Sequence, residues 1–282
     1  MKQELVIRAA RPDDLDTIYE IINDSARAYK GVIPEAAWHE PYMPMDHLRS
    51  EIAKGVRFYC CDLDDRTMGV MGIQDVQDVT LVRHAYVRSE SRSQGIGRAL
   101  LESVTRLRPR PVLIGAWKAA TWAIQFYQKN DFTLLNEARK NRMLGTYWTI
   151  SSFQVQESVV LADRRWMDRE SGAALHAAYE RFNARDIDGA LSLMTQDVIW
   201  PNGMEGGTVH GHEGIRAYWT RQWKVFDPRV TAQSITRESD GRYAVEVYQL
   251  VKDIAGVVLV DRTINHVYRL EDGLIASMEI RE

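Results

Sequence analysis

A glycine-containing turn offers the clearest spacing for chemistry in this sequence. Within residues 85–101, strand-forming residues lead into a loop and then directly into a helical pattern that opens with Gly95 and Gly97. Such a turn exposes backbone N–H groups that no helical carbonyl accepts, with the positive end of the helix dipole behind them. It predicts a pyrophosphate site, to which Arg92 and Arg98 add charge-assisted hydrogen bonds. A plain turn stays open as the alternative, because a G-x-G pattern alone is weak.

Two segments of the chain together resemble the GNAT acetyltransferase superfamily. Arg92, Gly95 and Gly97 stand on the fixed positions of that family's motif Arg/Gln-x-x-Gly-x-Gly/Ala. Residues 123–132 read Ala-Ile-Gln-Phe-Tyr-Gln-Lys-Asn-Asp-Phe and are similar to its A-x-x-F-Y-x-K-x-G-F segment. The resemblance covers about residues 4–161, and it implies the acyl-CoA N-acyltransferase fold with acetyl-CoA as the co-substrate.

The same resemblance implies roles for individual residues. The backbone of Tyr86 and Val87 would hold the pantetheine arm as a strand holds its neighbour. Tyr127 falls on the position often used as general acid, where a phenol can protonate the departing coenzyme A thiolate. Packing on the buried face of a helix is the other interpretation of Tyr127. The pyrophosphate contacts would come from Arg92, Ser93, Gln94, Gly95, Ile96, Gly97 and Arg98.

Three positions depart from the family's pattern. Ala120 replaces an asparagine, so one expected hydrogen bond to the cofactor arm is missing. Asp131 replaces a glycine at a helix end, where aspartate tolerates the left-handed conformation better than most residues. Leu81 stands where some members carry a glutamate, so the side chain there cannot accept the amine's proton.

Without that glutamate, deprotonation of the amine would go through water. Asp75, Asp78 and His84 are the polar candidates on or beside the strands that precede the turn. An ordinary hydrogen-bonded strand histidine is the other interpretation of His84. An amine with a lowered pKa could also bind already neutral.

The acceptor would approach from the early helices and their connecting loop, here residues 29–46. Trp38, Tyr42 and Met43 would line an aromatic wall there, or would simply pack the loop onto the domain. The reaction implied is direct attack of a primary amine of a small molecule on acetyl-CoA in a ternary complex. The residues predicted to contact the substrate are Trp38, Tyr42, Asp75 and His84.

The elements that must position these residues follow from hydrophobic periodicity and turn chemistry. They succeed one another as strand, helices, three-strand meander, helix, strand, helix and strand, which is a mixed α/β order. Helices are expected over about 12–28, 48–55, 95–107 and 119–129. Strands are expected over about 5–7, 56–62, 68–76, 79–87, 111–116, 132–135 and 158–161.

A second domain begins after the polar stretch Asp163-Arg164-Arg165. Residues 179–194 are similar to the opening of the SnoaL-like and ketosteroid-isomerase-like superfamily, also called nuclear-transport-factor-like, and residues 211–216 resemble the start of its third helix. This resemblance implies a cone-shaped α+β barrel, in which a cystatin-like curved sheet wraps a long helix. The expected domains are a GNAT domain at 1–163 and a SnoaL-like domain at 164–282.

The pocket of a SnoaL-like domain either catalyses or only binds. Steroid-isomerase chemistry is not expected, because that family's base aspartate falls near Pro201 and Asn202 and its proton-holding aspartate near Asn265. An isomerase, hydratase or cyclase activity, a ligand-binding role and dimerisation through the sheet all stay open. The residues expected to face the pocket are Trp200, Asn202, His210, Trp219, Trp223, Asp261, His266 and Glu279.

Composition narrows the partners. The chain has 282 residues and a formal net charge of -3, which gives no basic field for nucleic acid. It shows no signal-peptide core or membrane-spanning stretch, and the adjacent Cys60 and Cys61 would point to opposite faces of a strand. We expect a cytoplasmic homodimer without metal or membrane contact, whose ligands are acetyl-CoA and a small amine. An acyl-CoA-binding protein without turnover is the competing hypothesis.

Overall fold

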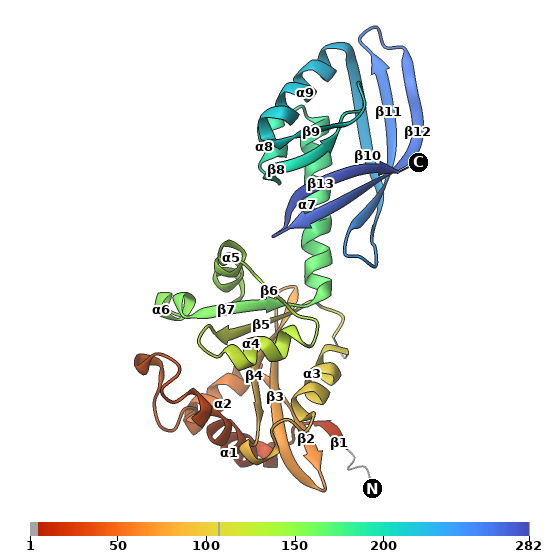
Figure 1. Cartoon of the computed structure of the whole chain (residues 1–282). Helices are drawn as coiled ribbons and strands as arrows, with labels where there is room; N and C mark the ends of the chain where they lie inside the picture. Colours follow the sequence, from red (N-terminus) through yellow and green to blue (C-terminus); the bar gives the residue numbers. More distant parts are fainter. Residues whose placement is uncertain (1–4, 107, 282) are drawn as a thin grey trace. The chain divides into compact units, whose positions relative to one another are not determined.

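The computed structural model describes residues 5–106 and 108–281 of the chain. The chain divides into two compact units, Met1–Trp166 and Met167–Glu282 (Figure 1). The division falls inside helix α7 (Arg164–Asn183), whereas the boundary expected from the sequence lies between residues 163 and 164. None of the described helices is long and apolar enough to cross a membrane.

Unit 1 is built on a seven-stranded mixed sheet with the strand order β1-β2-β3-β4-β5-β7-β6. Neighbouring strands run antiparallel except β4 and β5, which are parallel and are connected through helix α3. A parallel pair needs such a crossover, because a tight hairpin cannot join its ends. The strands are β1 (Leu5–Ala9), β2 (Arg57–Leu63), β3 (Arg66–Val76), β4 (Val79–Val87), β5 (Val112–Trp117), β6 (Thr133–Leu134) and β7 (Ser158–Ala162).

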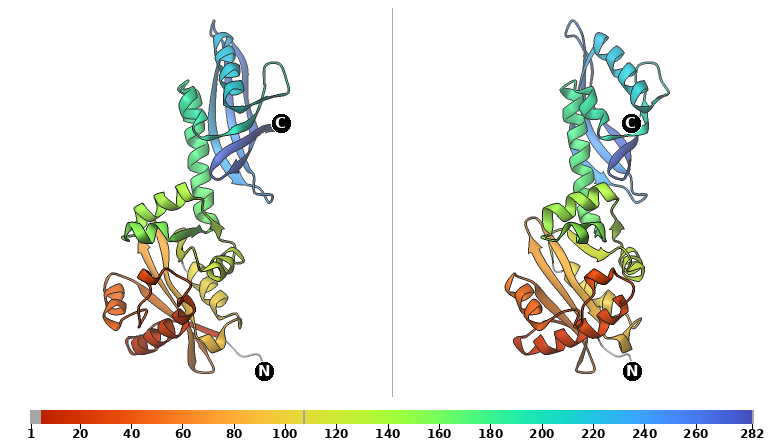
Figure 2. Two further views of the ribbon diagram at one scale, coloured as in Figure 1. Left: turned by 60° about the vertical axis from the view of Figure 1, so that its left-hand side comes forward. Right: turned by 90° about the vertical axis from the view of Figure 1, so that its left-hand side faces the viewer.

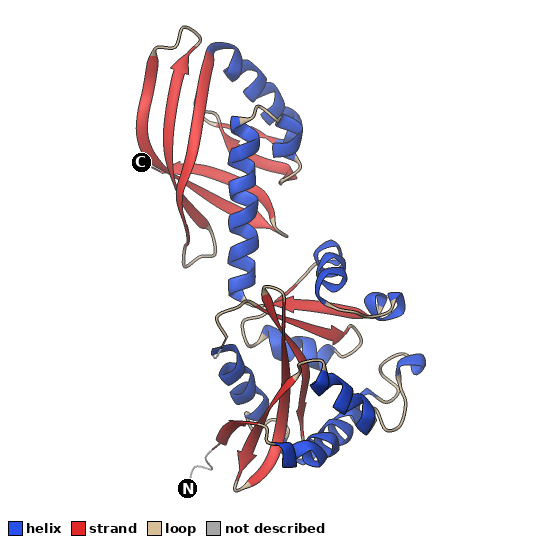
Figure 3. Cartoon of the chain, turned by 180° about the vertical axis from the view of Figure 1, so that it is seen from behind, coloured by secondary structure: helices blue, strands red, loops and turns tan. Residues whose placement is uncertain are grey.

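Helices cover both faces of this sheet (Figure 3). On one face, Ile18 and Ile22 of α1 share an apolar cluster with Cys60 of β2, and on the other, Leu100 of α3 shares a cluster with Cys61. The adjacent cysteines therefore point to opposite faces, as the strand alternation predicts, and both are free thiols. The helices are α1 (Leu15–Ala26), α2 (Met45–Ala53), α3 (Ile96–Arg106), α4 (Thr121–Gln128), α5 (Glu137–Tyr147) and α6 (Ser152–Gln156).

The start of α3 lies unusually close to β3, and a glycine makes this possible. A Cβ atom built on Gly69 would stand 2.6 Å from Cγ2 of Ile96, the first residue of α3. Any side chain at residue 69 would therefore push the helix start away from the sheet. Gly69 fixes the distance between the strand and the predicted pyrophosphate turn.

Helices α5 and α6 have no counterpart in the sequence prediction. They follow Asn136 and Ser151, whose side chains accept hydrogen bonds from the backbone N–H groups of Arg139 at 3.0 Å and Gln154 at 3.2 Å. Such N-caps are a sequence signal for a helix start that the prediction did not use. Asp131, by contrast, has a φ of 65°, which confirms the left-handed helix end predicted there.

Unit 2 packs its helices against an open six-stranded sheet of order β10-β11-β12-β13-β8-β9. Register shifts in the first three strand pairs mark bulges that bend the strands, and the sheet curves around the helices (Figure 2). The mixed α+β class with a curved sheet is confirmed, and because β9 and β10 are its edges, the described strands of unit 2 do not close into a barrel. Besides α7, the elements are α8 (Ile187–Leu191), β8 (Met194–Pro201), β9 (Thr208–His210), α9 (Gly211–Val225), β10 (Phe226–Arg237), β11 (Tyr243–Asp253), β12 (Val258–Glu271) and β13 (Leu274–Arg281).

Candidate active site

The parallel strands β4 and β5 separate after a short paired stretch. Their pairing runs from Thr80 with Val112 to Val82 with Ile114, although β4 continues to Val87. At the same point β4 carries an extra residue relative to β3, because the register shifts as pairing passes from one side of residue 83 to the other. A bulge bends the strand that contains it. The last part of β4 therefore faces a gap in the sheet, where an extended ligand could pair with its backbone.

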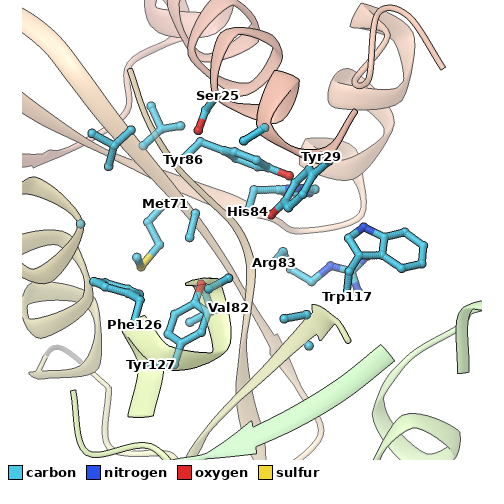
Figure 4. A pocket seen from close by; sticks show the side chains of 18 of the residues that line it. Ser25, Tyr29, Met71, Val82, Arg83, His84, Tyr86, Trp117, Phe126 and Tyr127 are labelled. Carbon is cyan, nitrogen blue, oxygen red and sulfur yellow. The ribbon is translucent and has the colours of Figure 1, made fainter. Parts of the chain in front are cut away.

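A cavity of about 970 Å³ lies at this split. Its wall is formed by the part of β4 that extends beyond the pairing with β5, the end of β5, helices α1, α2 and α4, and the turn before α3 (Figure 4). Trp38, Asp75 and Gln94 are predicted site residues that do not line it. The predicted residues that do line it are Tyr42, His84, Tyr86, Val87, Arg92, Ser93, Gly95, Ile96, Gly97, Arg98 and Tyr127.

The turn before α3 has the backbone geometry of an anion site. Ser93 and Gly95 have positive φ values of 64° and 83°. Where left-handed and right-handed residues alternate, successive backbone N–H groups point to one side. They form a small concave site that binds anions. Gly95 is required for its φ rather than for space, because a Cβ built there meets nothing within 4 Å. The turn and the start of α3 at Ile96 thus present N–H groups at one end of the cavity.

The two arginines of the turn are held by protein groups. Nη2 of Arg92 donates to the backbone oxygen of Ser25 at 3.0 Å, which ties the turn to the end of α1. Nε of Arg98 donates to Glu102 at 2.7 Å on the exposed side of α3. The backbone N–H groups are therefore the main anion donors of this turn, and the arginines add only their remaining N–H groups.

Tyr127 lines the cavity with its hydroxyl end, and its ring belongs to the apolar core. The ring packs edge-on against Phe126 and Phe132, with centroid distances of 5.1 and 6.2 Å. Burial, together with the neighbouring hydroxyl of Tyr29, raises the pKa of Tyr127 above its usual value. The phenol thus stays protonated at neutral pH, which is the form a general acid needs.

A group of aromatic side chains forms one wall of the cavity. The ring of Tyr29 lies 5.6 Å from that of Tyr42 and 6.5 Å from that of Tyr86, and Nε1 of Trp117 donates to the Tyr42 hydroxyl at 3.1 Å. Trp38 stacks on Tyr42 at 5.6 Å from outside the cavity. Tyr42 therefore contributes to the wall directly, while Trp38 supports it from behind.

Glu51 of α2 is a site residue that the sequence analysis missed. Its side chain is buried and lines the cavity, with Oε2 at 3.0 Å from Nη2 of Arg83 and 3.3 Å from Nε2 of His84. The hydrogen bond with His84 and the charge of Arg83 lower the pKa of Glu51 to about 2. Glu51 is thus a permanent carboxylate at neutral pH, and its hydrogen-bond partners Arg83 and His84 follow it by more than 30 positions.

His84 is held as a neutral imidazole beside this carboxylate. Burial lowers the pKa of His84 and outweighs the opposing effect of Glu51. The ring stacks on Phe58 with centroids 5.7 Å apart. Because the carboxylate can only accept, Nε2 of His84 carries the proton and Nδ1 keeps its lone pair. His84 therefore has an unprotonated nitrogen, which is the group that a general base requires.

The acidic residues expected beside the acceptor lie elsewhere. Asp75 pairs with Thr80 at the hairpin end of β3 and β4, away from the split, and its carboxylate binds Arg57 at 2.6 Å and the Thr80 hydroxyl at 2.7 Å. Asp78 accepts a hydrogen bond from Tyr147 at 2.9 Å. Both carboxylates therefore hold surface elements together, and the structure does not bring Asp75 to the cavity.

Unit 2 contains a smaller cavity of about 90 Å³ with a hydrogen-bonded chain in its wall. The Tyr268 hydroxyl donates to that of Tyr179 at 2.8 Å, which lies 3.1 Å from Nδ1 of His266. Burial lowers the pKa of His266 to about 4, and its Nε2 has no partner among the described residues. Of the residues expected to face this pocket, Trp200, Trp219 and His266 line it, whereas Asn202, His210, Trp223, Asp261 and Glu279 do not.

Within residues 5–106 and 108–281, no group of three or more His, Cys, Asp or Glu side chains is arranged to hold a metal ion. The features that remain are a split parallel strand pair, an N–H-rich turn at a helix start, a neutral histidine and a buried phenol. Together they define the GNAT class of acyltransferase fold.

Family comparisons agree with this class and identify the second unit. Residues 54–134 match the acetyltransferase (GNAT) domain family, and residues 175–278 match the SnoaL-like domain family. The chain therefore combines a GNAT acetyltransferase domain with a SnoaL-like domain. None of the curated proteins matches it.

Solved structures resemble each unit separately. The PaiA N-acetyltransferase from Thermoplasma acidophilum, in complex with coenzyme A, is 18% identical, and the match covers 57% of this chain and 98% of that one with a TM-score of 0.44. TerC co-crystallized with polyporic acid is 30% identical over 40% of this chain and 90% of its own, with a TM-score of 0.36. An NTF2-like protein of unknown function from Burkholderia pseudomallei is 28% identical over 40% and 89%, also with a TM-score of 0.36. The family assignment rests on the two domain matches.

Proposed function

We propose that this protein transfers an acetyl group from acetyl-CoA to the primary amine of a small molecule. The proposal rests on the cavity at the split of β4 and β5. The wall of this one cavity contains the anion-binding turn, a neutral histidine and a protonated phenol. The pyrophosphate would bind at the turn, and the pantetheine arm would pair with the backbone of Tyr86 and Val87. The thioester would then lie beside Tyr127.

Acetyl transfer can proceed by direct attack in a ternary complex. The amine nitrogen bonds to the thioester carbonyl carbon and passes its proton to Nδ1 of His84, directly or through one water. The carbon–sulfur bond then breaks, and the phenol of Tyr127 gives its proton to the sulfur, so that free coenzyme A leaves as a thiol. Glu51 holds His84 in the required tautomer. Solvent then takes the proton from His84 and returns one to Tyr127, which regenerates both groups. Positioning of the two substrates supplies much of the rate.

For the SnoaL-like domain we propose a ligand-binding or dimerisation role. Its small cavity and the unpartnered Nε2 of His266 support binding of a ligand. Exposed apolar side chains on and beside β12, among them Ile254 at 79% and Val257 at 57%, support contact with a second copy of the chain. We place the homodimer in the cytoplasm.

Release of free thiol from acetyl-CoA tests the transferase function. The protein is incubated with acetyl-CoA and a panel of primary amines, and the acetylated amine is identified by mass spectrometry. We expect one thiol per acetylated amine. Absence of coenzyme A binding by calorimetry would remove the proposal.

Binding of coenzyme A without turnover is the second candidate function. Ala120, which is buried at the start of α4 and makes no side-chain hydrogen bond, favours it, because the cofactor arm loses one anchor there. Tyr127→Phe separates the two functions. A catalyst loses rate with this change, whereas a binder has no rate to lose and keeps its affinity.

A further inference from the structure

The cavity extends beyond the part that the cofactor needs. A strand rises by about 3.3 Å per residue, so Arg83 lies roughly 13 Å from Val87 along β4. In the proposed function, acetyl-CoA occupies Tyr86, Val87 and the turn that follows. The opposite end, where Arg83 and the buried Glu51 of α2 line the wall, therefore belongs to the acceptor.

Arg83 is free to bind an anion at this end. It is the bulged residue of β4, and Figure 4 shows its side chain extending into the cavity toward Trp117. Nη2 donates to Glu51 at 3.0 Å, and Glu51 is the one partner of Arg83 within residues 5–106 and 108–281. A guanidinium has five N–H donors, so most of them stay available in a side chain that is 23% exposed. Carboxylates are among the groups that such a planar fork binds with two parallel hydrogen bonds.

The charges at this end also favour an anion. Arg83 and Lys54 are cationic, and Lys54 lies 3.9 Å from Oε1 of Glu51. Among the described residues that line the cavity, Glu51 is the one carboxylate, and Arg83 and Lys54 share it. His84 is neutral. The two cations share one carboxylate, so the acceptor end carries one positive charge in excess. An acidic group on the acceptor would balance this charge.

An aromatic wall adjoins these cations. Tyr42 and Trp117 are joined by a hydrogen bond of 3.1 Å, and both line the cavity into which Arg83 extends toward Trp117 (Figure 4). Nε1 of Trp117 is occupied by the Tyr42 hydroxyl, which is also hydrogen-bonded to Tyr86, so ring carbons are left to face a ligand. A flat apolar group of the acceptor would be buried there.

From the free guanidinium, the uncompensated charge and the aromatic wall, we infer that the acceptor is an aromatic amino acid, whose carboxylate binds Arg83 and whose ring packs on Tyr42 and Trp117. This inference rests on the proposed acetyl transfer. It makes Arg83 a specificity-determining residue, with Lys54 as a weaker contributor that is 64% exposed.

L-Phenylalanine and 2-phenylethylamine form a matched pair for the test, because they differ only in the carboxylate. With the thiol-release assay, we expect kcat/KM for phenylalanine to exceed that for phenylethylamine by about tenfold or more. Arg83→Met should abolish or reverse this preference, mainly by raising KM for phenylalanine, while Arg83→Lys should retain part of it. Arg49→Met serves as the control, because Arg49 lies on the same helix as Glu51, is 62% exposed and does not line the cavity.

The outcomes separate this inference from the proposed function. Acetylation of phenylethylamine at least as good as that of phenylalanine, or an unchanged preference in Arg83→Met, overturns the aromatic amino acid and leaves the transferase intact. Failure of every amine in a broad panel refutes the transferase itself. Lys54→Met covers the case in which Arg83→Met does not fold, and we expect it to lower the preference by about twofold to threefold.

Discussion

The two cavities of this protein each hold a largely buried, neutral histidine, yet one ring offers a lone pair and the other an N–H group. In the GNAT domain, His84 donates from Nε2 to the permanent carboxylate of Glu51, so Nδ1 offers a lone pair. In the SnoaL-like domain, Nδ1 of His266 faces the hydroxyl of Tyr179, which accepts from Tyr268. The only arrangement that gives both buried hydroxyl protons an acceptor makes Tyr179 donate to Nδ1 and leaves the proton on Nε2.

The contrast shows how a neighbour selects the chemistry of a histidine that burial has already made neutral. A carboxylate beside the ring makes it a proton acceptor, as a base must be. A chain of phenols makes it a proton donor, which suits an uncharged oxygen of a ligand. The larger cavity, with its Arg and Lys lining, thus fits a reaction on charged substrates, and the smaller one fits binding.

The largest effect should come from Tyr127→Phe, which removes the acid from the GNAT cavity and leaves the other cavity untouched. We expect kcat to fall by about 1,000-fold, in the range of general acid catalysis. Coenzyme A affinity, measured by calorimetry, should stay within about twofold, because the ring still packs in the core. A variant with full kcat would assign Tyr127 a packing role only.

Acid should destabilise the SnoaL-like domain through His266. Its pKa is lowered from 6.5 to about 4 by burial, so the unfolded chain takes up the proton first as the pH falls. The stability that the neutral His266 ring contributes is complete above pH 6.5 and is lost as the pH falls towards 4. This loss lowers the free energy of unfolding by about 3 kcal/mol. Urea denaturation at both pH values should show this loss in the parent and not in His266→Phe. Equal losses in both proteins would place the acid sensitivity elsewhere.

Glu51→Gln should affect the base of the GNAT cavity and no property of the smaller cavity. Without the carboxylate, His84 is no longer held in one tautomer, and we expect kcat to fall about tenfold. The parent's kcat should rise with pH to a plateau, with the rising limb at lower pH than an ordinary histidine would give, because burial lowers the pKa of His84. Glu51 opposes that shift, so its loss should move the rising limb to lower pH. A pH–rate profile that Glu51→Gln leaves unchanged contradicts the pairing.

The smallest effect concerns the turn. Gly95→Ala forces a φ of 83° on a residue with a side chain, which costs about 1 kcal/mol, and coenzyme A should bind about fivefold more weakly. Gly97→Ala is the matched control for stability, because its new methyl would meet Phe126 at an ordinary 3.4 Å and needs no positive φ. Thermal unfolding and calorimetry of both variants measure the difference.

The local features of the site were predictable from the sequence. The turn from Arg92 to Arg98 and the strand before it depend on consecutive residues, and the left-handed Asp131 follows from its position at a helix end. The cysteine alternation was predictable for the same reason. Such features need no knowledge of which strands become neighbours.

The rest of the site depends on the fold. Glu51 meets His84 only because the fold brings the side chain of an α2 residue to the bulge of β4, and neither the bulge nor that contact has a sequence signal of its own. Asp75 is close to the turn in sequence, yet strand direction carries it to the hairpin end. A prediction based on distance along the chain was therefore wrong for Asp75, and it could not find Glu51.

The structure of the protein with coenzyme A bound tests the central claim most directly. We predict that the pantetheine arm lies between β4 and β5 and pairs with the backbone of Tyr86 and Val87. The pyrophosphate should accept hydrogen bonds from the N–H groups of the turn from Ser93 to Gly97, with the sulfur beside the Tyr127 hydroxyl. Coenzyme A bound anywhere else, or a split that stays empty at saturating coenzyme A, contradicts the account.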